Sequence, residues 1–211
     1  MSENAFQARS GLQLPEMATL APAPSSDAGV RIALKEDFQI ASVAARRGQV
    51  PDLNARCRAL AGITMPDGPA RVCKPPFTIL GVGPDRWLLL RAGDMPLARD
   101  LAIAFGASAS VCDQSDGYVI FQVSGHRARN VLAKGVPIDL DPEVFDPGRC
   151  AVTTIAHIGA IVWQSDDLPT YEIAIFRSFA DAFWHWLIAS SAQFGVTFDP
   201  TSLPIPDHTH D

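Results

Sequence analysis

Short apolar runs separated by turn-forming residues dominate residues 30–199. Runs of four to eight such residues, rich in Val, Ile, Leu and Phe, are typical of strands. Between two of them stand Gly83, Pro84 and Asp85, a sequence that predicts a hairpin turn. The strands expected from this pattern are 30–34, 38–43, 78–82, 86–90, 118–123, 150–156, 160–163 and 171–176.

Apolar residues at helical spacing mark a second kind of segment. In the last of these segments, Ser178 stands at the N-cap position, Asp181 three residues later suits a capping box, and Gly195 suits the end. Ser124 is expected to cap the N-terminus of another helix, 125–134. The expected helices are 51–61, 96–105, 125–134 and 178–194. The buried face of the last helix is expected to hold Phe179, Ala182, Phe183, Trp186, Leu187 and Phe194.

The order of these elements is similar in the two halves of the chain. It predicts an α+β fold with two similar small lobes, each an antiparallel or mixed sheet with helices packed on one side. We expect residues 30–106 to form the first lobe and residues 107–199 the second. Residues 1–29 are expected to form an extended arm, and residues 200–211 an acidic tail that contains prolines.

The composition indicates a folded chain. Of the 211 residues, 47% are hydrophobic, which excludes a largely disordered protein. Charged residues make up only 19%, against about 25% in average proteins. This shortage of charge suggests that another protein covers part of the surface.

Charge and hydropathy exclude two classes of partner. The net charge is −6, and no run of basic residues exceeds Arg46-Arg47, so a nucleic-acid partner is not expected. The apolar runs are far shorter than the roughly 20 residues that span a membrane. The N-terminal residues do not resemble a secretory signal. We therefore expect a cytoplasmic protein.

No catalytic constellation is apparent. The widely spaced Cys57, Cys73, Cys112 and Cys150 form no C-x-x-C pair and predict reduced thiols. Pro84 removes an amide donor from the one glycine-rich turn, which therefore cannot cradle a dinucleotide. We expect no catalytic, cofactor-binding or metal-binding residues on this chain. Two alternatives, an acid–base pair at Asp139 and Asp141 or a weak metal site at His208 and His210, are less favoured than solvated side chains.

Two segments are candidates for contact with a partner. Trp184 and His185 fall partly off the expected buried face of the last helix, so they belong either to a second packing layer or to a partner interface. In the C-terminal tail, Leu203 and Ile205 place apolar groups on a proline-stiffened segment that could dock on a partner. The alternative for the tail is disorder.

Several segments together resemble the gamma subunit family of heterotetrameric sarcosine oxidase. The segment 83–89, Gly-Pro-Asp-Arg-Trp-Leu-Leu, is similar to a Gly-Pro-acid-x-Trp-Leu-Leu pattern of that family. The resemblance covers about residues 30–198, and its strength lies in the order of the segments. The other matching segments are 113–117, 124–135, 137–140, 145–150 and 177–187.

This resemblance implies a non-catalytic subunit with a fold like the folate-binding fold of aminomethyltransferases. It implies alpha, beta and delta partner subunits in a complex that demethylates sarcosine to glycine, passes the one-carbon unit to tetrahydrofolate and produces hydrogen peroxide. FAD, FMN, NAD, tetrahydrofolate and zinc are then expected on those other subunits. The resemblance transfers no catalytic residue to this chain.

Two alternative functions remain open. The chain could serve a related complex that oxidises another N-methyl amino acid, such as N-methylglutamate, because a gamma subunit does not contact the substrate. It could instead be a stand-alone folate-binding protein similar to aminomethyltransferases.

Overall fold

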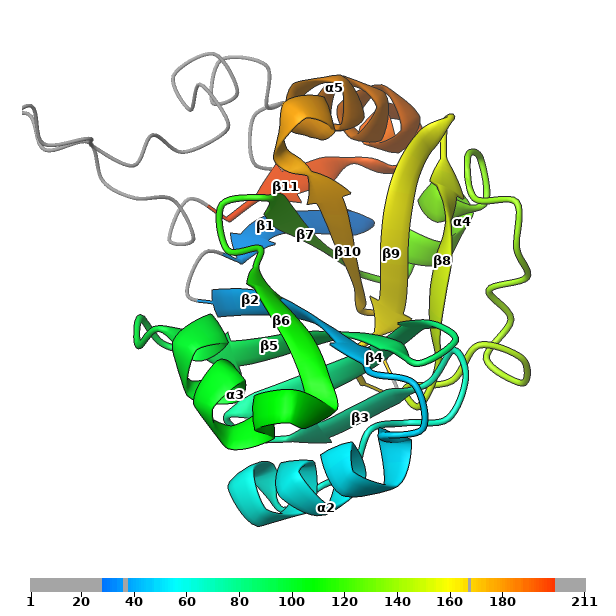
Figure 1. Ribbon diagram of the computed structural model, residues 1–211. Coiled ribbons are helices and arrows are strands. Elements are labelled where there is room, and N and C mark those ends of the chain that lie inside the picture. The colour runs from blue at the N-terminus through cyan, green and yellow to red at the C-terminus, as the bar shows by residue number, and fades with distance from the viewer. Residues whose placement is uncertain (1–27, 36–37, 167, 200–211) are drawn as a thin grey trace, which may run out of the picture.

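Two sheets stacked face to face form the centre of the molecule (Figure 1). The computed structural model describes residues 28–35, 38–166 and 168–199. Helices cover the outer face of each sheet, so the layers run helix, sheet, sheet, helix. This arrangement confirms the α+β class and the placement of helices on one side of each sheet.

The first sheet has six strands in the order β11-β1-β7-β10-β9-β8. Its neighbouring strands are antiparallel except for β1 and β11, which are parallel. The strands are β1 (Val30–Lys35), β7 (Tyr118–Ser124), β8 (Cys150–Ile155), β9 (Ile158–Gln164), β10 (Tyr171–Phe176) and β11 (Val196–Phe198).

The second sheet has five antiparallel strands in the order β3-β4-β5-β2-β6. The expected hairpin joins β4 to β5, and Asp85 in its turn has a φ of 54°. The strands are β2 (Phe38–Ala45), β3 (Arg71–Lys74), β4 (Phe77–Gly83), β5 (Arg86–Ala92) and β6 (Ala109–Asp113).

Each sheet carries its own helices. α2 (Val50–Ala61) and α3 (Leu97–Phe105) pack on the second sheet, and α4 (Ala128–Leu132) and α5 (Ala180–Ser191) pack on the first. Gly62 ends α2 in the left-handed conformation, as its position in the sequence predicts. Short 3-10 turns, at Gly106–Ser108, Arg177–Phe179 and Ala192–Phe194, flank α3 and α5.

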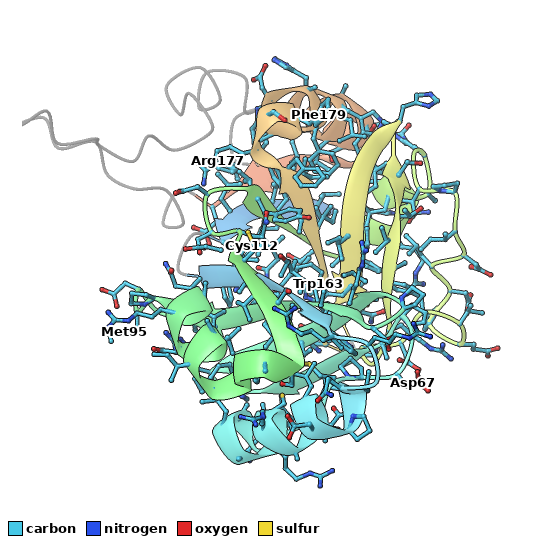
Figure 2. The ribbon with its side chains drawn as sticks, in the orientation of Figure 1. Asp67, Met95, Cys112, Trp163, Arg177 and Phe179 are labelled. Carbon is cyan, nitrogen blue, oxygen red and sulfur yellow. The ribbon has the colours of Figure 1, made fainter. Side chains whose placement is uncertain are left out.

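The central strands are apolar on both faces because each sheet is covered twice. Successive side chains of a strand point to opposite faces. On β5, Leu89 packs toward the helices and Leu88 toward the other sheet, and on β7 Phe121 and Ile120 divide in the same way. The layer between the sheets, which includes Trp163 (Figure 2), is formed by Ile40, Leu80, Leu88, Leu90, Ile120, Cys150, Ile161, Trp163 and Ala174.

The two lobes are not consecutive in sequence, and here the expected boundaries are wrong. β1 belongs to the first half of the sequence, but it pairs with β7 and β11 of the second half in the first sheet. β6, which follows residue 106, pairs with β2 in the second sheet. Each half of the chain thus contributes one strand to the sheet of the other half. This exchange depends on pairing between residues distant in sequence, which element order does not reveal.

Two expected helix caps are also wrong. Ser124 is held in β7 opposite Arg31, so α4 begins four residues later and is short. Ser178 lies inside the 3-10 turn that precedes α5, whose N-cap residue is Phe179 and has no side-chain cap. The amide of Arg177 donates to the carbonyl oxygen of Gly117, which fixes this turn on the β6–β7 connection.

The buried face of α5 is displaced around the helix from the one expected. Its fully buried apolar residues include Ala180, Phe183, Trp184 and Leu187, whereas Phe179 is half exposed. Most of the helix is apolar, so its hydrophobic pattern has little contrast and more than one face could be buried. Packing against the first sheet selects the face.

No helix in the described part of the chain is both long enough and apolar enough to cross a membrane.

Shortening a side chain between the sheets should destabilise the whole fold. Leu80 is fully buried there, so Leu80→Ala is expected to lower the free energy of unfolding by about 2–5 kcal/mol. Ile103 is 73% exposed on α3, and Ile103→Ala should change it by less than about 0.5 kcal/mol. Urea denaturation followed by tryptophan fluorescence measures both values, and equal effects would contradict this account of the core.

Candidate functional site

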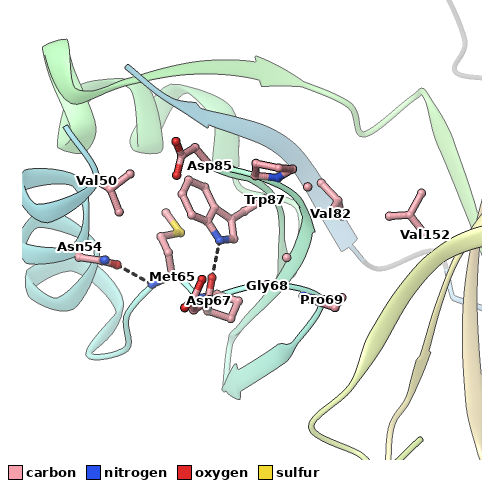
Figure 3. Close-up of a pocket in the computed structure, with 14 residues that line it drawn as sticks. Val50, Asn54, Met65, Asp67, Gly68, Pro69, Val82, Asp85, Trp87 and Val152 are labelled. Atoms are coloured by element: carbon pink, nitrogen blue, oxygen red, sulfur yellow. Dashed lines mark hydrogen bonds between the residues drawn. The ribbon is translucent and has the colours of Figure 1, made fainter. Parts of the chain in front are cut away.

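A cleft of about 830 Å³ lies where the rim of the second sheet approaches the edge of the first. Its walls are the start of α2, the segment 65–69, the β4–β5 hairpin and Val152 on β8 (Figure 3). It therefore combines elements from both sheets. Four of the hairpin residues on its wall, Gly83, Pro84, Asp85 and Trp87, belong to the segment 83–89 that carries part of the family resemblance.

Two side chains hold the segment 65–69 in place. The indole nitrogen of Trp87 donates to the carbonyl oxygen of Pro66 at 2.9 Å, and the side-chain oxygen of Asn54 accepts from the amide of Met65 at 2.9 Å. The side chain of Trp87 is buried, and its indole N–H makes this hydrogen bond from within the core. The position of the cleft wall thus depends on the same tryptophan that anchors β5 in the core.

Close contact between two backbones closes the inner end of the cleft. Gly81 donates its amide to the carbonyl oxygen of Ala70 at 2.9 Å. A Cβ atom at Gly81 would lie 1.9 Å from the carbonyl oxygen of Gly68, so a side chain cannot fit there. Glycine at this position allows β4 and the segment before β3 to touch.

The charge of the cleft is negative. Asp67 and Asp85 supply carboxylates, and no lysine or arginine is among the described residues that line it. Carboxylates next to apolar walls suit a positively charged group. A catalytic nucleophile paired with a base is not among these lining residues.

Cys150 is buried against the backbone at the closed end of the cleft and is expected to be unreactive. Its Sγ contacts the carbonyl oxygens of Gly81 at 3.2 Å and Ala70 at 3.4 Å. Burial raises the pKa of this thiol from 9.0 to about 11, so it stays protonated at neutral pH. A protonated thiol is a poor nucleophile.

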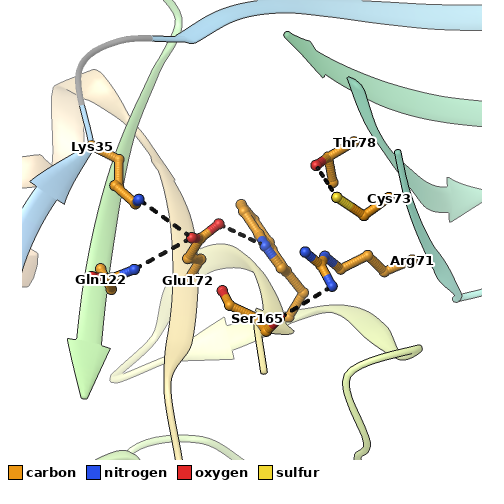
Figure 4. A network of polar contacts seen from close by, with 8 residues as sticks. Lys35, Arg71, Cys73, Thr78, Gln122, Ser165 and Glu172 are labelled. Carbon is orange, nitrogen blue, oxygen red and sulfur yellow. Dashed lines mark hydrogen bonds and ion pairs between the residues drawn. The ribbon is translucent and has the colours of Figure 1, made fainter. Parts of the chain in front are cut away.

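A polar network braces the sheets beside this region (Figure 4). The carboxylate of Glu172 accepts from the indole nitrogen of Trp163 at 2.8 Å and lies 4.0 Å from the ammonium of Lys35. From the other sheet, the guanidinium of Arg71 donates to the carbonyl oxygens of Pro147 at 3.2 Å and Ser165 at 3.5 Å. These contacts link strands and turns of the two sheets, while Nε of Arg71 is buried without a hydrogen-bond partner among the described residues.

The residues expected to contact a partner differ in their exposure. Trp184 is 0% exposed and packs edge-on against Phe198, so the partner-interface hypothesis is wrong for it and the packing alternative is right. His185, its neighbour, is exposed and lies 3.6 Å from Asp181. Leu203 and Ile205 lie outside the described residues. Of the expected contact residues that the structure describes, only His185 is exposed.

The alternative catalytic residues serve turns. Asp139 accepts the amide of Asp141, and Asp141 in turn accepts the amide of Glu143, so each caps a local turn. Of the other histidines, His157 has a φ of 70° in the two-residue turn between β8 and β9. Within the described ranges, no three His, Cys, Asp or Glu residues are grouped as metal ligands. His208 and His210 lie outside these ranges.

Comparisons with a family model and with curated sequences point to the same family. A model of the family described as "Sarcosine oxidase, gamma subunit family" matches residues 47–193. Sarcosine oxidase subunit gamma from Corynebacterium sp. (strain P-1) is 32% identical over 117 residues, which is 55% of this chain and 57% of that protein. The corresponding subunit from Arthrobacter sp. is 32% identical over 118 residues, with the same shares. The chain thus spans 57% of the length of these two curated relatives.

Solved structures extend the likeness. A chain of heterotetrameric sarcosine oxidase from Corynebacterium sp. U-96, in complex with pyrrole 2-carboxylate, superposes with a TM-score of 0.76 and 25% identity, covering 90% of this chain and 97% of that chain. Glycine cleavage system aminomethyltransferase T from Bartonella henselae superposes with a TM-score of 0.57 over 88% of this chain and 50% of that chain. At 13% identity, the second likeness shows a shared fold alone.

Gly81→Ala should disturb the closed end of the cleft. The added methyl group must displace backbone, so we expect the free energy of unfolding to fall by about 1–3 kcal/mol. Gly159→Ala is the matched control, because a Cβ there meets nothing within 4 Å. Urea denaturation of both variants measures the difference. Equal stability of the two variants would show that β4 and the segment before β3 are not in tight contact.

The four thiols should fall into two classes. Cys73 and Cys112 are exposed and should react with a thiol reagent at pH 8, whereas the buried Cys57 and Cys150 should react only after unfolding. Burial raises the pKa of both buried thiols from 9.0 to about 11, so stability present below pH 9 should be lost as the pH rises toward 11. Mass spectrometry of labelled peptides identifies the fast thiols. Rapid labelling of Cys150 in the folded chain would contradict its burial.

Proposed function

Because the chain belongs to the sarcosine oxidase gamma subunit family, we propose that it is a non-catalytic subunit of a heterotetrameric sarcosine oxidase, with alpha, beta and delta subunits as its partners. The observation that carries this proposal is the likeness over 90% of the chain to one chain of such a heterotetramer. The curated relatives are also named as subunits.

The proposed complex demethylates sarcosine to glycine, transfers the one-carbon unit to tetrahydrofolate and reduces oxygen to hydrogen peroxide. In this proposal FAD, FMN, NAD and zinc are held by the other subunits. Among the described residues that line the cleft, none supplies a cation for the anionic glutamate of tetrahydrofolate. We therefore route no step of the reaction through residues of this chain.

Exposed aromatic groups support a role in assembly. Phe176 and Phe179 are 48% and 50% exposed at the junction of β10 and α5, near the end of the molecule where Phe179 is labelled in Figure 2. Phe176 stacks on Tyr118 with ring centroids 4.7 Å apart, so it is held in place while open to solvent. Aromatic side chains are enriched at protein interfaces.

A second candidate is a stand-alone folate-binding protein, favoured by the fold shared with aminomethyltransferase T. The likeness covers only 50% of that protein, so this chain has the counterpart of half of its structure. Titration of the full chain with tetrahydrofolate, followed by tryptophan fluorescence, separates the candidates. Saturable micromolar binding would favour the folate-binding protein.

Co-expression with the alpha, beta and delta subunits tests the subunit role. We expect this chain to co-purify in stoichiometric amount with flavin absorbance, and to show no flavin absorbance when purified alone. Omitting it should lower the yield of the assembled oxidase, because its apolar surface completes the assembly. A complex that assembles and oxidises sarcosine fully without this chain would contradict the proposal, and parallel assays with N-methylglutamate identify the substrate.

A further inference from the structure

β8 is the last strand of the first sheet, and its outer edge is open. The amide of Cys150 donates to Pro69 at 3.2 Å, so it points away from β9. Along an antiparallel strand, the backbone N–H and C=O groups of every second residue point away from the paired strand. The backbone amides and carbonyls of Val152 and Thr154 therefore also point outward, and no described residue outside β8 bonds to them.

Both ends of this open edge are closed by the protein itself. Pro69 accepts the amide of Cys150 at one end, and Gly135 accepts the amide of Ala156 at 3.1 Å at the other. The six steps between these two amides span about 20 Å at the rise of an extended strand. An extended segment of about three to five residues fits this gap.

The open stretch has none of the usual protection against strand addition. Natural edge strands are commonly guarded by charged residues, proline or a bulge. Residues 151–154 are Ala-Val-Thr-Thr, and β8 pairs with β9 without a bulge. Val152 is 58% exposed and lines the cleft, so a strand added here would place side chains at the mouth of the cleft.

The cleft indicates the chemistry of that segment. Asp67 and Asp85 make it negative, and Trp87, Met65 and Val82 supply apolar walls (Figure 3). The long side chain of lysine or arginine combines an apolar stem with a cationic head and complements such a cleft.

We propose that β8 binds an extended, basic segment of a partner subunit by strand addition, and that a lysine or arginine of this segment enters the cleft bearing Asp67 and Asp85. The inference rests on the proposed subunit role and adds where and how a partner is held. Main-chain hydrogen bonds to Val152 and Thr154 supply affinity, and the cleft supplies selectivity.

The test uses the full chain co-expressed with its partner subunits. Val152→Pro removes one outward amide without touching the ladder to β9, and proline is tolerated on edge strands. We expect it to weaken assembly by about tenfold or more. Val111→Pro is the matched control, because the amide of Val111 points outward from β6, the edge of the other sheet, and its effect on assembly should be within about twofold.

A charge variant tests the cleft separately. Asp67→Asn combined with Asp85→Asn should weaken assembly and reduce its dependence on salt concentration, because a screened attraction is lost. Asp94→Asn, an exposed carboxylate outside the cleft, should leave both unchanged.

Hydrogen exchange of the wild-type complex gives a readout that does not depend on variants. The amides of Val152 and Thr154 should be protected in the assembly. A wild-type complex in which these amides exchange rapidly and Val152→Pro assembles normally would overturn this inference while leaving the subunit role intact. Self-association of the chain through β8 would also overturn it. Absence of any complex with the wild-type chain would overturn the proposed function and the inference together.

Discussion

The face-to-face packing of the two sheets is the constraint on which the rest of the structure depends. It favours apolar residues on both sides of the central strands, as Leu88 and Leu89 on β5 illustrate. Helices then cover only the outer faces, where they complete two further cores. Charged residues are rare in such buried layers, and they make up only 19% of this chain.

The cleft arises where this packing ends. Gly81 touches the backbone before β3, Cys150 bonds to the same segment, and Arg71 links the second sheet to turns of the first. These contacts join the two sheets along part of their rim and leave the rest of the β8 edge uncovered. The negatively charged cleft and the unpaired edge of β8 therefore lie side by side, because both border the region where the two sheets are joined.

A subunit role accords with this design. The described polar groups are used mainly for turns, caps and bracing, as Asp139, Asp141 and Glu172 show. What the surface offers instead is a strand edge, a cleft for a cation and exposed aromatic rings at Phe176 and Phe179. Such features suit the partner recognition that we propose, and they occur on a fold that aminomethyltransferase T shares.

The sequence by itself determined the strands that form continuous apolar runs, the turn at Gly83-Pro84-Asp85 and the end of α2 at Gly62, because these features depend on near neighbours. It also carried the family resemblance. Tertiary structure decided the exchange of β1 and β6, the short edge strands β3 and β11, and the burial of Trp184. The exchange of β1 and β6 and the pairing of β11 with β1 depend on partners distant in sequence. β3 pairs with its neighbour β4, but it has only four residues, two of them charged, and so lacks a clear apolar run. Trp184 lies on a helix whose apolar pattern allows more than one buried face, and only packing against Phe121 and Phe198 selects it. The cleft likewise required folding, because Asp67, Asp85 and Val152 meet only when the two sheets stack.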